Sequence, residues 1–466
     1  MTAERRIMAI ASLGLAAVAM AATLGTGAAS SRTATAVSET STPAPSPATI
    51  PQPSLDPLPA PTRRRLAPDD RRVDLAVPSF SDPTRITNPL FPIGRLRSAV
   101  IVGRLGGKPL RIETSLIPGT RTVDWNGGRI DTLQSQFLAF LDGRIYEVAV
   151  DKYAQDDAGA VWYLGEEAFS YRDGVVSDTG DTWLAGVDGP PAMIMPGHPR
   201  VGDVFRTENA PGKIFEQVTV ERLGQTVRGP TGPVRGAMVG QELHIEGDVE
   251  DKTFAPGYGE FFSGLGRDYE ATALAVPADA ASGPTPAALR DLSRDAVAVA
   301  GAARAHAWSA AADVSARART DWRAYRRTGA PRRLVAWTDR AVRGLTAAVT
   351  AHDSRRTALA ALAVAEAGLD LQLRYRSADA VDLARLRLWT RRLAVDAAAG
   401  DRGAVDGDVR SLEWVRDRVT LRARDAGRID DRLRFLRAAA EAGQLRAAAV
   451  AARRLRAAAA GVAPRP

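Results

Sequence analysis

The chain has 466 residues, 45% of them hydrophobic, and a formal net charge of +8 at pH 7. This length allows two domains of ordinary size, each with its own core. No cysteine is present, which excludes disulfides, thiolate metal sites, cysteine nucleophiles and a lipid-modified cysteine. Because the positive charge comes mostly from arginines interleaved with aspartates, we expect no nucleic-acid binding and only a weak attraction to anionic surfaces.

The first 29 residues have the pattern of a secretory signal. Arg5 and Arg6 precede an apolar run over 7–24, and small residues follow it. A positive start, an apolar stretch and a small-residue exit are the features of a signal peptide. We therefore predict a signal peptide over 1–29 and a secreted or envelope-associated protein. An uncleaved membrane anchor is the alternative, because the run is near the lower limit for spanning a bilayer. The choice between the general and twin-arginine export routes stays open.

Residues 30–75 are rich in Pro, Ser, Thr and Ala. A segment of this composition has few side chains with which to form a core, and its prolines favour extended conformers. We predict a disordered linker that separates the folded part from the membrane or wall.

Residues 76–282 have the pattern of a β-rich domain. Short runs of strand-forming residues are separated by turn residues, and two turns have the Asp-Gly sequence typical of hairpins, Asp142-Gly143 and Asp173-Gly174. Many short strands between such turns predict an antiparallel sandwich or half-barrel. The predicted strands include 99–102, 110–117, 134–141, 144–150, 161–164, 169–171, 175–176, 214–221, 234–245 and 249–254.

One stretch of this part resembles a known pattern. It consists of Tyr153-Ala154-Gln155-Asp156, then Val161-Trp162-Tyr163, then Gly165-Glu166. The pattern resembles that of an uncharacterised family of exported bacterial all-β proteins, over about residues 80–263, with a departure between 221 and 239. The resemblance implies a β module, such as a half-barrel, outside the cytoplasm. It implies no catalytic residues.

Residues 283–466 predict an up-and-down α-helical bundle. The segment is rich in Ala, Arg, Leu and Asp and contains few turn residues, and short connections between long helices favour antiparallel neighbours. The fold class is therefore α+β, with a β domain followed by a bundle. The predicted helices are 286–327, 331–350, 354–375, 378–399, 405–424 and 429–459, the first with an interruption near Gly301.

Polar residues on the apolar stripes of these helices are candidate metal ligands. One stripe continues to His306 and Asp313, and another contains Glu366 and Asp370, which lie four residues apart and share a helix face. Carboxylates and histidines that point into a bundle form metal sites in some proteins. A divalent metal in the bundle is therefore one hypothesis. The alternative is that nearby arginines form structural ion pairs with these carboxylates.

The β part contains an aromatic and acidic cluster, formed by Trp162, Tyr163, Glu166 and Glu167. A pair of carboxylates facing one cleft could perform acid-base hydrolysis. Because successive strand residues face opposite sides, we favour a different interpretation, with one aromatic in the core and both glutamates in solvent. His244 lies in an alternating strand and has no specific signal.

No motif in the chain specifies an activity. We favour a non-enzymatic exported protein that binds an unknown envelope ligand or partner protein, with no cofactor. Two alternatives stay open: an extracytoplasmic metal-binding protein that uses the bundle interior, and a hydrolase that uses acidic residues of the β part.

Overall fold

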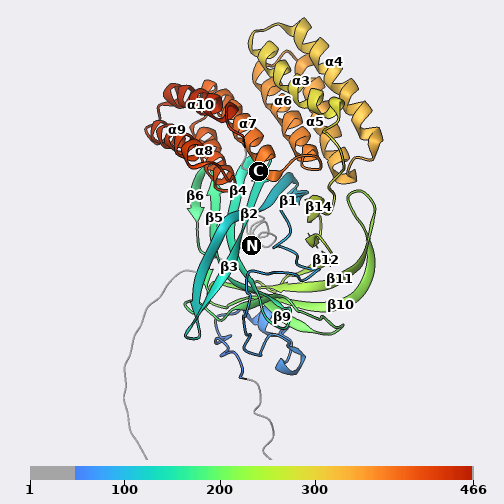
Figure 1. Cartoon of the computed structure of the whole chain (residues 1–466), viewed down its shortest axis with the longest axis vertical. Coiled ribbons are helices and arrows are strands. Elements are labelled where there is room, and N and C mark those ends of the chain that lie inside the picture. Colours follow the sequence, from blue (N-terminus) through green and yellow to red (C-terminus); the bar gives the residue numbers. More distant parts are fainter. Residues whose placement is uncertain (1–47, 464–466) are drawn as a thin grey trace, which may run out of the picture.

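The computed structural model describes residues 48–463. The predicted signal peptide and the first part of the predicted linker lie outside these residues. The chain has an α+β fold, with a 14-stranded antiparallel sheet between residues 98 and 276, followed by a helical region (Figure 1). The predicted α+β class is confirmed, with the sheet in the middle of the chain and a helical region after it.

The strands of the sheet are paired antiparallel throughout. They are β1 (Ser98–Leu105), β2 (Lys108–Trp125), β3 (Gly128–Leu141), β4 (Arg144–Gln155), β5 (Val161–Arg172), β6 (Val175–Asp178), β7 (Trp183–Leu184), β8 (Ala192–Met195), β9 (Val204–Ala210), β10 (Ile214–Arg228), β11 (Pro233–His244), β12 (Val249–Ala255), β13 (Gly259–Leu265) and β14 (Asp268–Val276).

The sheet is built from two meanders that meet at their first and last strands. Strands β1 to β6 follow one another on one side, β9 to β14 follow one another on the other side, and β1 pairs with β14. The short strand β8 pairs with β5 and contacts β9. The sheet is strongly curved (Figure 1), and β8 connects strands β5 and β9 near its two ends.

Both predicted Asp-Gly hairpins are confirmed. Asp142 and Gly143 have φ angles of 49° and 74°, and Asp173 and Gly174 have φ angles of 51° and 78°. Two consecutive residues with positive φ form the turn whose twist matches that of the flanking strands. These turns connect β3 to β4 and β5 to β6.

The two faces of the sheet have different surroundings. Along β3, Leu138 and Phe140 pack against helices, whereas Ser135 and Phe137 line a cavity on the other side. This alternation follows from the twofold repeat of a strand. We call the helix-covered side the outer face and the cavity side the inner face.

Eight helices follow the sheet: α3 (Ala287–Arg304), α4 (Trp308–Tyr325), α5 (Arg332–Thr350), α6 (Ser354–Gln372), α7 (Ala378–Ala398), α8 (Arg402–Asp417), α9 (Ala423–Glu441) and α10 (Leu445–Ala460). They form two groups of four. Helices α3 to α6 contact one another in a ring, as do α7 to α10, and the groups touch through α6 and α7 (Figure 1).

Two predicted helices are each divided in two. The first is interrupted around His306, which has a φ of 56°, and the last is interrupted at Gly443, which has a φ of 68°. A residue in the left-handed region ends a helix, and glycine adopts it at low cost. The second break was not predicted, because a single glycine in an alanine-rich segment is a weak signal.

The sheet and the helices share hydrophobic clusters. Val100 and Leu274 of the outer face pack with residues of α3 to α6, and Phe140 and Val148 pack with residues of α7 to α10. Trp389 of α7 stacks on Phe140 with ring centroids 5.0 Å apart. The sheet also has a hydrophobic cluster of its own, but the two parts do not have fully separate cores, because the helices cover an apolar face of the sheet.

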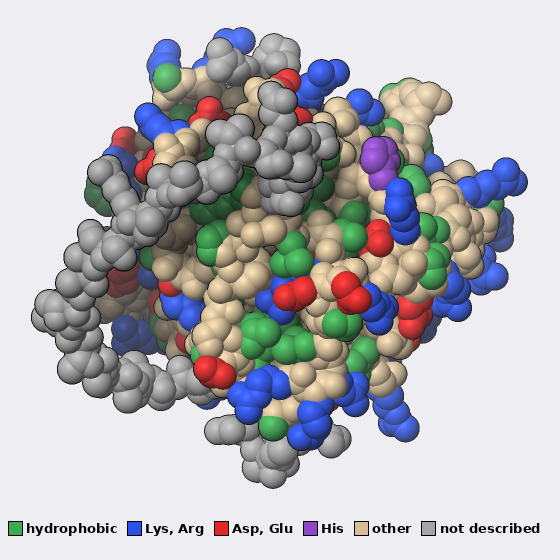
Figure 2. All heavy atoms as spheres, turned by 90° about the horizontal axis from the view of Figure 1, so that it is seen from below, with side chains coloured by type: hydrophobic (Ala, Val, Ile, Leu, Met, Phe, Trp, Pro, Cys, Tyr) green, Lys and Arg blue, Asp and Glu red, His purple; other side chains and the backbone are tan. Residues whose placement is uncertain are grey.

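Part of the predicted linker is packed against the sheet. Ile50 and Leu58 are buried, and the Thr62 hydroxyl donates a hydrogen bond to the Ile245 carbonyl. This segment contains α2 (Ala60–Arg63) and the 3₁₀ turn η1 (Asp69–Arg71), and it lies at the end of the molecule opposite the helices (Figure 1). Figure 2 shows this end, where Lys and Arg side chains gather mainly around the edge. Among the described residues, no helix has the length and hydrophobicity needed to cross a membrane.

Candidate metal centre

The inner face of the sheet surrounds a polar cavity of about 140 Å³. Its wall contains nine carboxyl side chains and only two basic side chains, Lys252 and His244. The carboxyl side chains are Glu147, Asp151, Glu166, Glu208, Glu216, Glu242, Glu250, Glu260 and Glu270.

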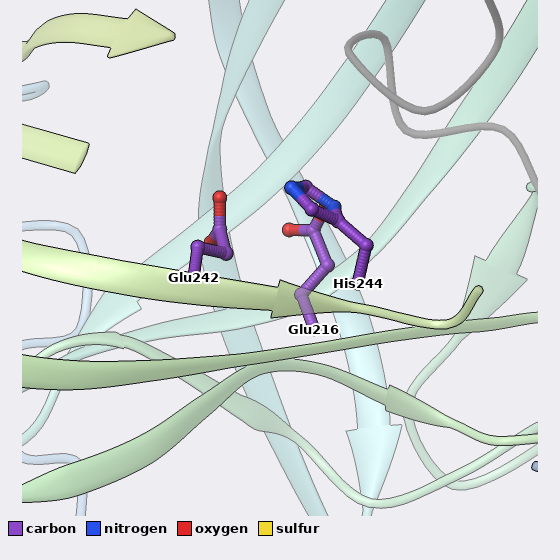
Figure 3. Close-up of side chains that lie close together, drawn as sticks. All are labelled: Glu216, Glu242 and His244. Atoms are coloured by element: carbon purple, nitrogen blue, oxygen red, sulfur yellow. The ribbon is translucent and has the colours of Figure 1, made fainter. Parts of the chain in front are cut away.

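Strand pairing places the basic and acidic groups together. Glu242 and His244 are two residues apart on β11 and therefore point to the same side. Glu216 of β10 pairs directly with His244, and Glu250 of β12 pairs with Glu242. Figure 3 shows the side chains of Glu216, Glu242 and His244 projecting from neighbouring strands toward one another.

His244 lies between two carboxylates. Its Nδ1 is 3.0 Å from Glu216 Oε1, and its Nε2 is 3.2 Å from Glu250 Oε2. Burial alone would lower the pKa of His244, but the hydrogen bonds to Glu216 and Glu250 outweigh burial and raise it to about 10. The imidazole is therefore positively charged at neutral pH, with a proton on each ring nitrogen. A metal ion that binds one of these nitrogens would displace the proton from it.

Lys252 is the second cation of the cavity. Its Nζ is 2.6 Å from Glu242 Oε2 and 3.2 Å from Glu260 Oε1. The Thr207 hydroxyl donates a hydrogen bond of 3.0 Å to the other oxygen of Glu242. Burial would lower the pKa of Lys252, but the surrounding glutamates raise it well above its ordinary value.

The remaining carboxyl groups are not matched by cations. Burial raises the pKa of Glu147 to about 8 and that of Asp151 to about 6, and it raises the pKa of Glu166, Glu208 and Glu270 well above the ordinary value. Neighbouring carboxylates raise the pKa of these four glutamates further. Several of these carboxyl groups therefore retain their protons at neutral pH, and the protein avoids burying their negative charges.

Several carboxyl oxygens of the cavity have no hydrogen-bond donor within the described part of the chain. They are Glu147 Oε2, Glu166 Oε1, Glu208 Oε2 and Glu250 Oε1, and all four residues are at least nine-tenths buried. A buried polar atom without a partner is costly. The cavity therefore has free oxygen atoms that could bind a cation if the carboxyl groups gave up their protons.

Glu216, Glu242 and His244 have the geometry of a metal site. One ligand atom from each lies within 4.8 Å of the others, and within the range 48–463 no other group of three such residues is arranged in this way. Two carboxylates and an imidazole suit divalent ions such as Zn²⁺ and Mn²⁺. Glu250, on the other side of the imidazole, is a further oxygen donor.

A second cavity, of about 110 Å³, adjoins the polar one and shares Phe137, Asp151, Tyr153, Glu260 and Glu270 with it. The side chain of Glu260 is 37% exposed, whereas those of Glu242 and Glu250 are almost fully buried. Glu260 thus reaches from the wall of the cavity to solvent.

The residues predicted to bind metal in the bundle are placed differently. His306 and Asp313 are exposed at the α3–α4 connection and on α4. Glu366 and Asp370 share a face of α6 as predicted, but this face meets Arg111 of β2, whose guanidinium lies 3.5 Å from Glu366 and 2.6 Å from Asp370. The structure does not bring the four residues together.

Asp370 instead belongs to a buried ion-pair network between the sheet and α6–α8. Arg385 lies 2.7 Å from Asp370 and 2.8 Å from Asp382, and Arg418, just after α8, lies 2.6 Å from Glu113 of β2. With Arg111, the network has three arginines for three fully buried carboxylates. The alternative prediction from the sequence, that nearby arginines form structural ion pairs with these carboxylates, is correct for Asp370.

The aromatic and acidic cluster of β5 is divided between the two faces. Glu166 is buried in the polar cavity, whereas Glu167 is half-exposed on the outer face and lies 3.3 Å from Lys152. The two glutamates therefore do not face one cleft, which removes the basis of the hydrolase hypothesis for this pair. The prediction that both glutamates are exposed to solvent is wrong for Glu166. Tyr163 also lines the cavity and donates a hydrogen bond to Asp151.

The importance of His244 and Glu242 was missed from the sequence. The available signal was the polar residue at every second position in the sequences Glu242-Leu243-His244 and Glu250-Asp251-Lys252. In a half-buried strand, the repeated polar set is normally assigned to the solvent side. Here the alternating polar side chains lie on the inner face of a strongly curved sheet.

Comparisons with protein-family models, curated proteins and solved structures give no match for this chain. The functional argument therefore rests on the geometry of the site.

Proposed function

We propose that this protein is an extracytoplasmic binding protein that holds a divalent metal ion inside its curved sheet, at Glu216, Glu242 and His244. The observation that carries this proposal is the imbalance of the cavity wall, with nine carboxyl groups against two cations. A bound cation would stabilise the ionised forms of these carboxyls and supply a partner for their free oxygens.

The size of the cavity favours an ion over an organic ligand. Pockets that bind cofactors and drug-sized molecules typically measure about 300–1,000 Å³, and this cavity measures about 140 Å³. It accommodates a metal ion with a few water molecules. A polymeric substrate such as a polysaccharide does not fit, so we propose a binding role and no hydrolysis.

The donor set favours Zn²⁺ or Mn²⁺. Carboxylate oxygens with one imidazole nitrogen suit borderline divalent ions, whereas a copper(I) site uses sulfur donors, and the chain has no cysteine. Ca²⁺ and Mg²⁺ prefer oxygen donors alone. We therefore expect Zn²⁺ and Mn²⁺ to bind more tightly than Ca²⁺ or Mg²⁺.

The location and the finer fold class are parts of the same proposal. The signal-like N-terminus and the resemblance of residues 80–263 to exported all-β proteins support export, and the curvature of the sheet supports the half-barrel alternative. In this proposal the protein binds its metal ion outside the cytoplasm.

Calorimetric titration of the metal-stripped full chain tests the metal site. We expect one Zn²⁺ or Mn²⁺ per chain, and Glu242→Gln, which removes a charged ligand atom but keeps the shape, should weaken binding by at least about tenfold, because an anionic contact is worth roughly 1.5–3 kcal/mol. Glu221→Gln is the matched control, because Glu221 lies on the same strand as Glu216 but is exposed. Unchanged binding in Glu242→Gln would refute the site.

A further inference from the structure

A different cavity, of about 400 Å³, lies where the two groups of helices meet. Its wall comes from α3 and α6 of the first group, and from α7 and α10 of the second. Apolar side chains form its floor, among them Val297, Ala358, Leu362 and Val395, and Leu362 is 3% exposed. This volume is in the range of pockets that hold organic ligands.

The rim of this cavity is cationic. Arg304, Arg355, Arg391 and Arg456 line it, together with His306, and no Asp or Glu does. Arg355 is neutralised by Asp396 and Asp401. Within residues 48–463, Arg304, Arg391 and Arg456 form no ion pair, and these three differ from other unpaired arginines of the helices in lining one cavity.

These three arginines also lie close enough to repel one another. Burial lowers the pKa of Arg391, and the charges of Arg456 and Arg304 lower it further. The same holds for Arg456, whose pKa is lowered by burial and by Arg453 and Arg304. Arg304 and Arg391 are exposed and Arg456 is half-buried, so water screens part of this repulsion, and an anion between the three guanidinium groups would relieve the rest.

The floor and the rim together define the ligand. An anion alone would leave the apolar floor in contact with water, and an apolar molecule alone would leave the arginines unpaired. We propose that this cavity binds a small anionic amphiphile, with an acyl or similar apolar body against Leu362 and Val395 and a carboxylate or phosphate head between Arg304, Arg391 and Arg456. Guanidinium groups suit both head groups because they donate two parallel hydrogen bonds.

This site is independent of the proposed metal centre. The metal centre lies on the inner face of the sheet, and the cavity lies between helices. Binding of an amphiphile therefore needs no metal, and failure of either proposal leaves the other intact.

Calorimetric titration of the full chain with dodecanoate tests the inference. We expect saturable binding of one dodecanoate per chain. Dodecyltrimethylammonium, which has the same apolar body but a positive head, should not bind, and inorganic phosphate should bind at least about tenfold more weakly than dodecanoate because it cannot cover the apolar floor. Equal binding of the cationic amphiphile, or of phosphate, would overturn the proposal.

Variants locate the binding site. The double variant Arg391→Ala, Arg456→Ala should bind dodecanoate at least about tenfold more weakly, since contacts to a charged group are worth roughly 1.5–3 kcal/mol each. Arg454→Ala is the matched control, because Arg454 is exposed on the same helix as Arg456 but does not line the cavity. Unchanged binding in the double variant would refute the site.

A second variant acts on the apolar floor. Ala394→Trp places a large side chain in the cavity from a half-buried position on α7, and it should abolish dodecanoate binding while thermal unfolding confirms that the variant is folded. If the Ala394→Trp variant is folded and still binds dodecanoate, the proposal that the amphiphile lies in this cavity is overturned. Sedimentation with vesicles of anionic lipid distinguishes between two ligands, a free amphiphile and a membrane surface. Vesicle binding that is lost in Arg454→Ala but not in the double variant would indicate that an exposed patch binds the membrane, and it would contradict binding in the cavity.

Discussion

The two faces of the sheet carry two buried polar clusters of opposite character. On the outer face, Arg111, Arg385 and Arg418 balance three buried carboxylates, and each guanidinium has an acidic partner within 2.8 Å. On the inner face, nine carboxyls face two cations. Among the described residues both clusters contain buried polar atoms without a hydrogen-bond partner, such as Arg418 Nη1 in the first and Glu208 Oε2 in the second, so the clusters differ in their balance of charge. Burial of charge alone therefore does not indicate a ligand site, and the proposed metal site rests instead on the imbalance of charge.

The largest expected effect comes from breaking the balance of the outer network. Arg385→Met leaves Asp370, Asp382 and Glu113, which are all buried, with one guanidinium fewer. Removing one partner of a buried ion pair costs about 3–5 kcal/mol of unfolding free energy, and chemical denaturation measures it. Arg323→Met, at an exposed arginine of α4, is the control. A loss of less than about 1 kcal/mol would show that the network is not stabilised by its balance.

The inner cluster should respond in the opposite way, by gaining stability when a cation is added. At a free Zn²⁺ concentration 100 times the dissociation constant, one site that binds only the folded state adds about 2.7 kcal/mol to the unfolding free energy. Denaturation of the wild type and of His244→Gln at fixed pH, with and without Zn²⁺, measures this gain. We expect the variant to lose it, and an equal gain in both proteins would contradict the comparison.

The two clusters also differ in their expected pH dependence. Burial raises the pKa of Glu147 from its ordinary 4.5 to about 8, so between these pH values the folded state binds more protons than the unfolded state. The unfolding free energy therefore falls as pH rises through this window, by up to about 1.4 kcal/mol per pH unit. The arginines lower the pKa of Glu113 in spite of its burial, so its contribution is instead present above the ordinary carboxyl range and lost as pH falls below it.

Glu147→Gln isolates the contribution of the inner cluster. The amide keeps the neutral form of the side chain, so the variant should lose less stability than the wild type between pH 5 and 8. Urea denaturation at several pH values, with metal removed, measures the two slopes, and Glu221→Gln serves as the exposed control. Parallel profiles for the wild type and Glu147→Gln would show that the carboxyl ionises at its ordinary pKa.

The smallest effect is expected at Glu167, the neighbour of Glu166 on the opposite face. Its carboxylate is 47% exposed and lies 3.3 Å from Lys152, whose side chain is 5% exposed. Because water screens the exposed partner, this ion pair should contribute less than the fully buried pairs do, at most about 1 kcal/mol. Glu167→Gln should therefore change the unfolding free energy by less than this amount in thermal or chemical denaturation. A loss of several kcal/mol would place Glu167 with the buried clusters.

The sequence alone determined the local features of this protein. The Asp-Gly turns at 142–143 and 173–174, the extent of α5, α6 and α7, and the shared face of Glu366 and Asp370 follow from backbone preferences and periodicities that act over a few residues. The division into a β part and a helical part follows from the same local patterns.

The tertiary structure decided which polar groups meet. A twofold repeat divides a strand into two faces but does not say which face is enclosed. In addition, the pairing of β10 with β11 is irregular between Val220 and Arg222, which changes the face to which the following residues point. Arg111 and Asp370 are separated by 259 residues along the chain, and Glu208 and Glu147 come from different meanders. Whether a carboxylate is paired with an arginine or left free for a cation thus depends on contacts between distant strands and helices, which no local pattern encodes.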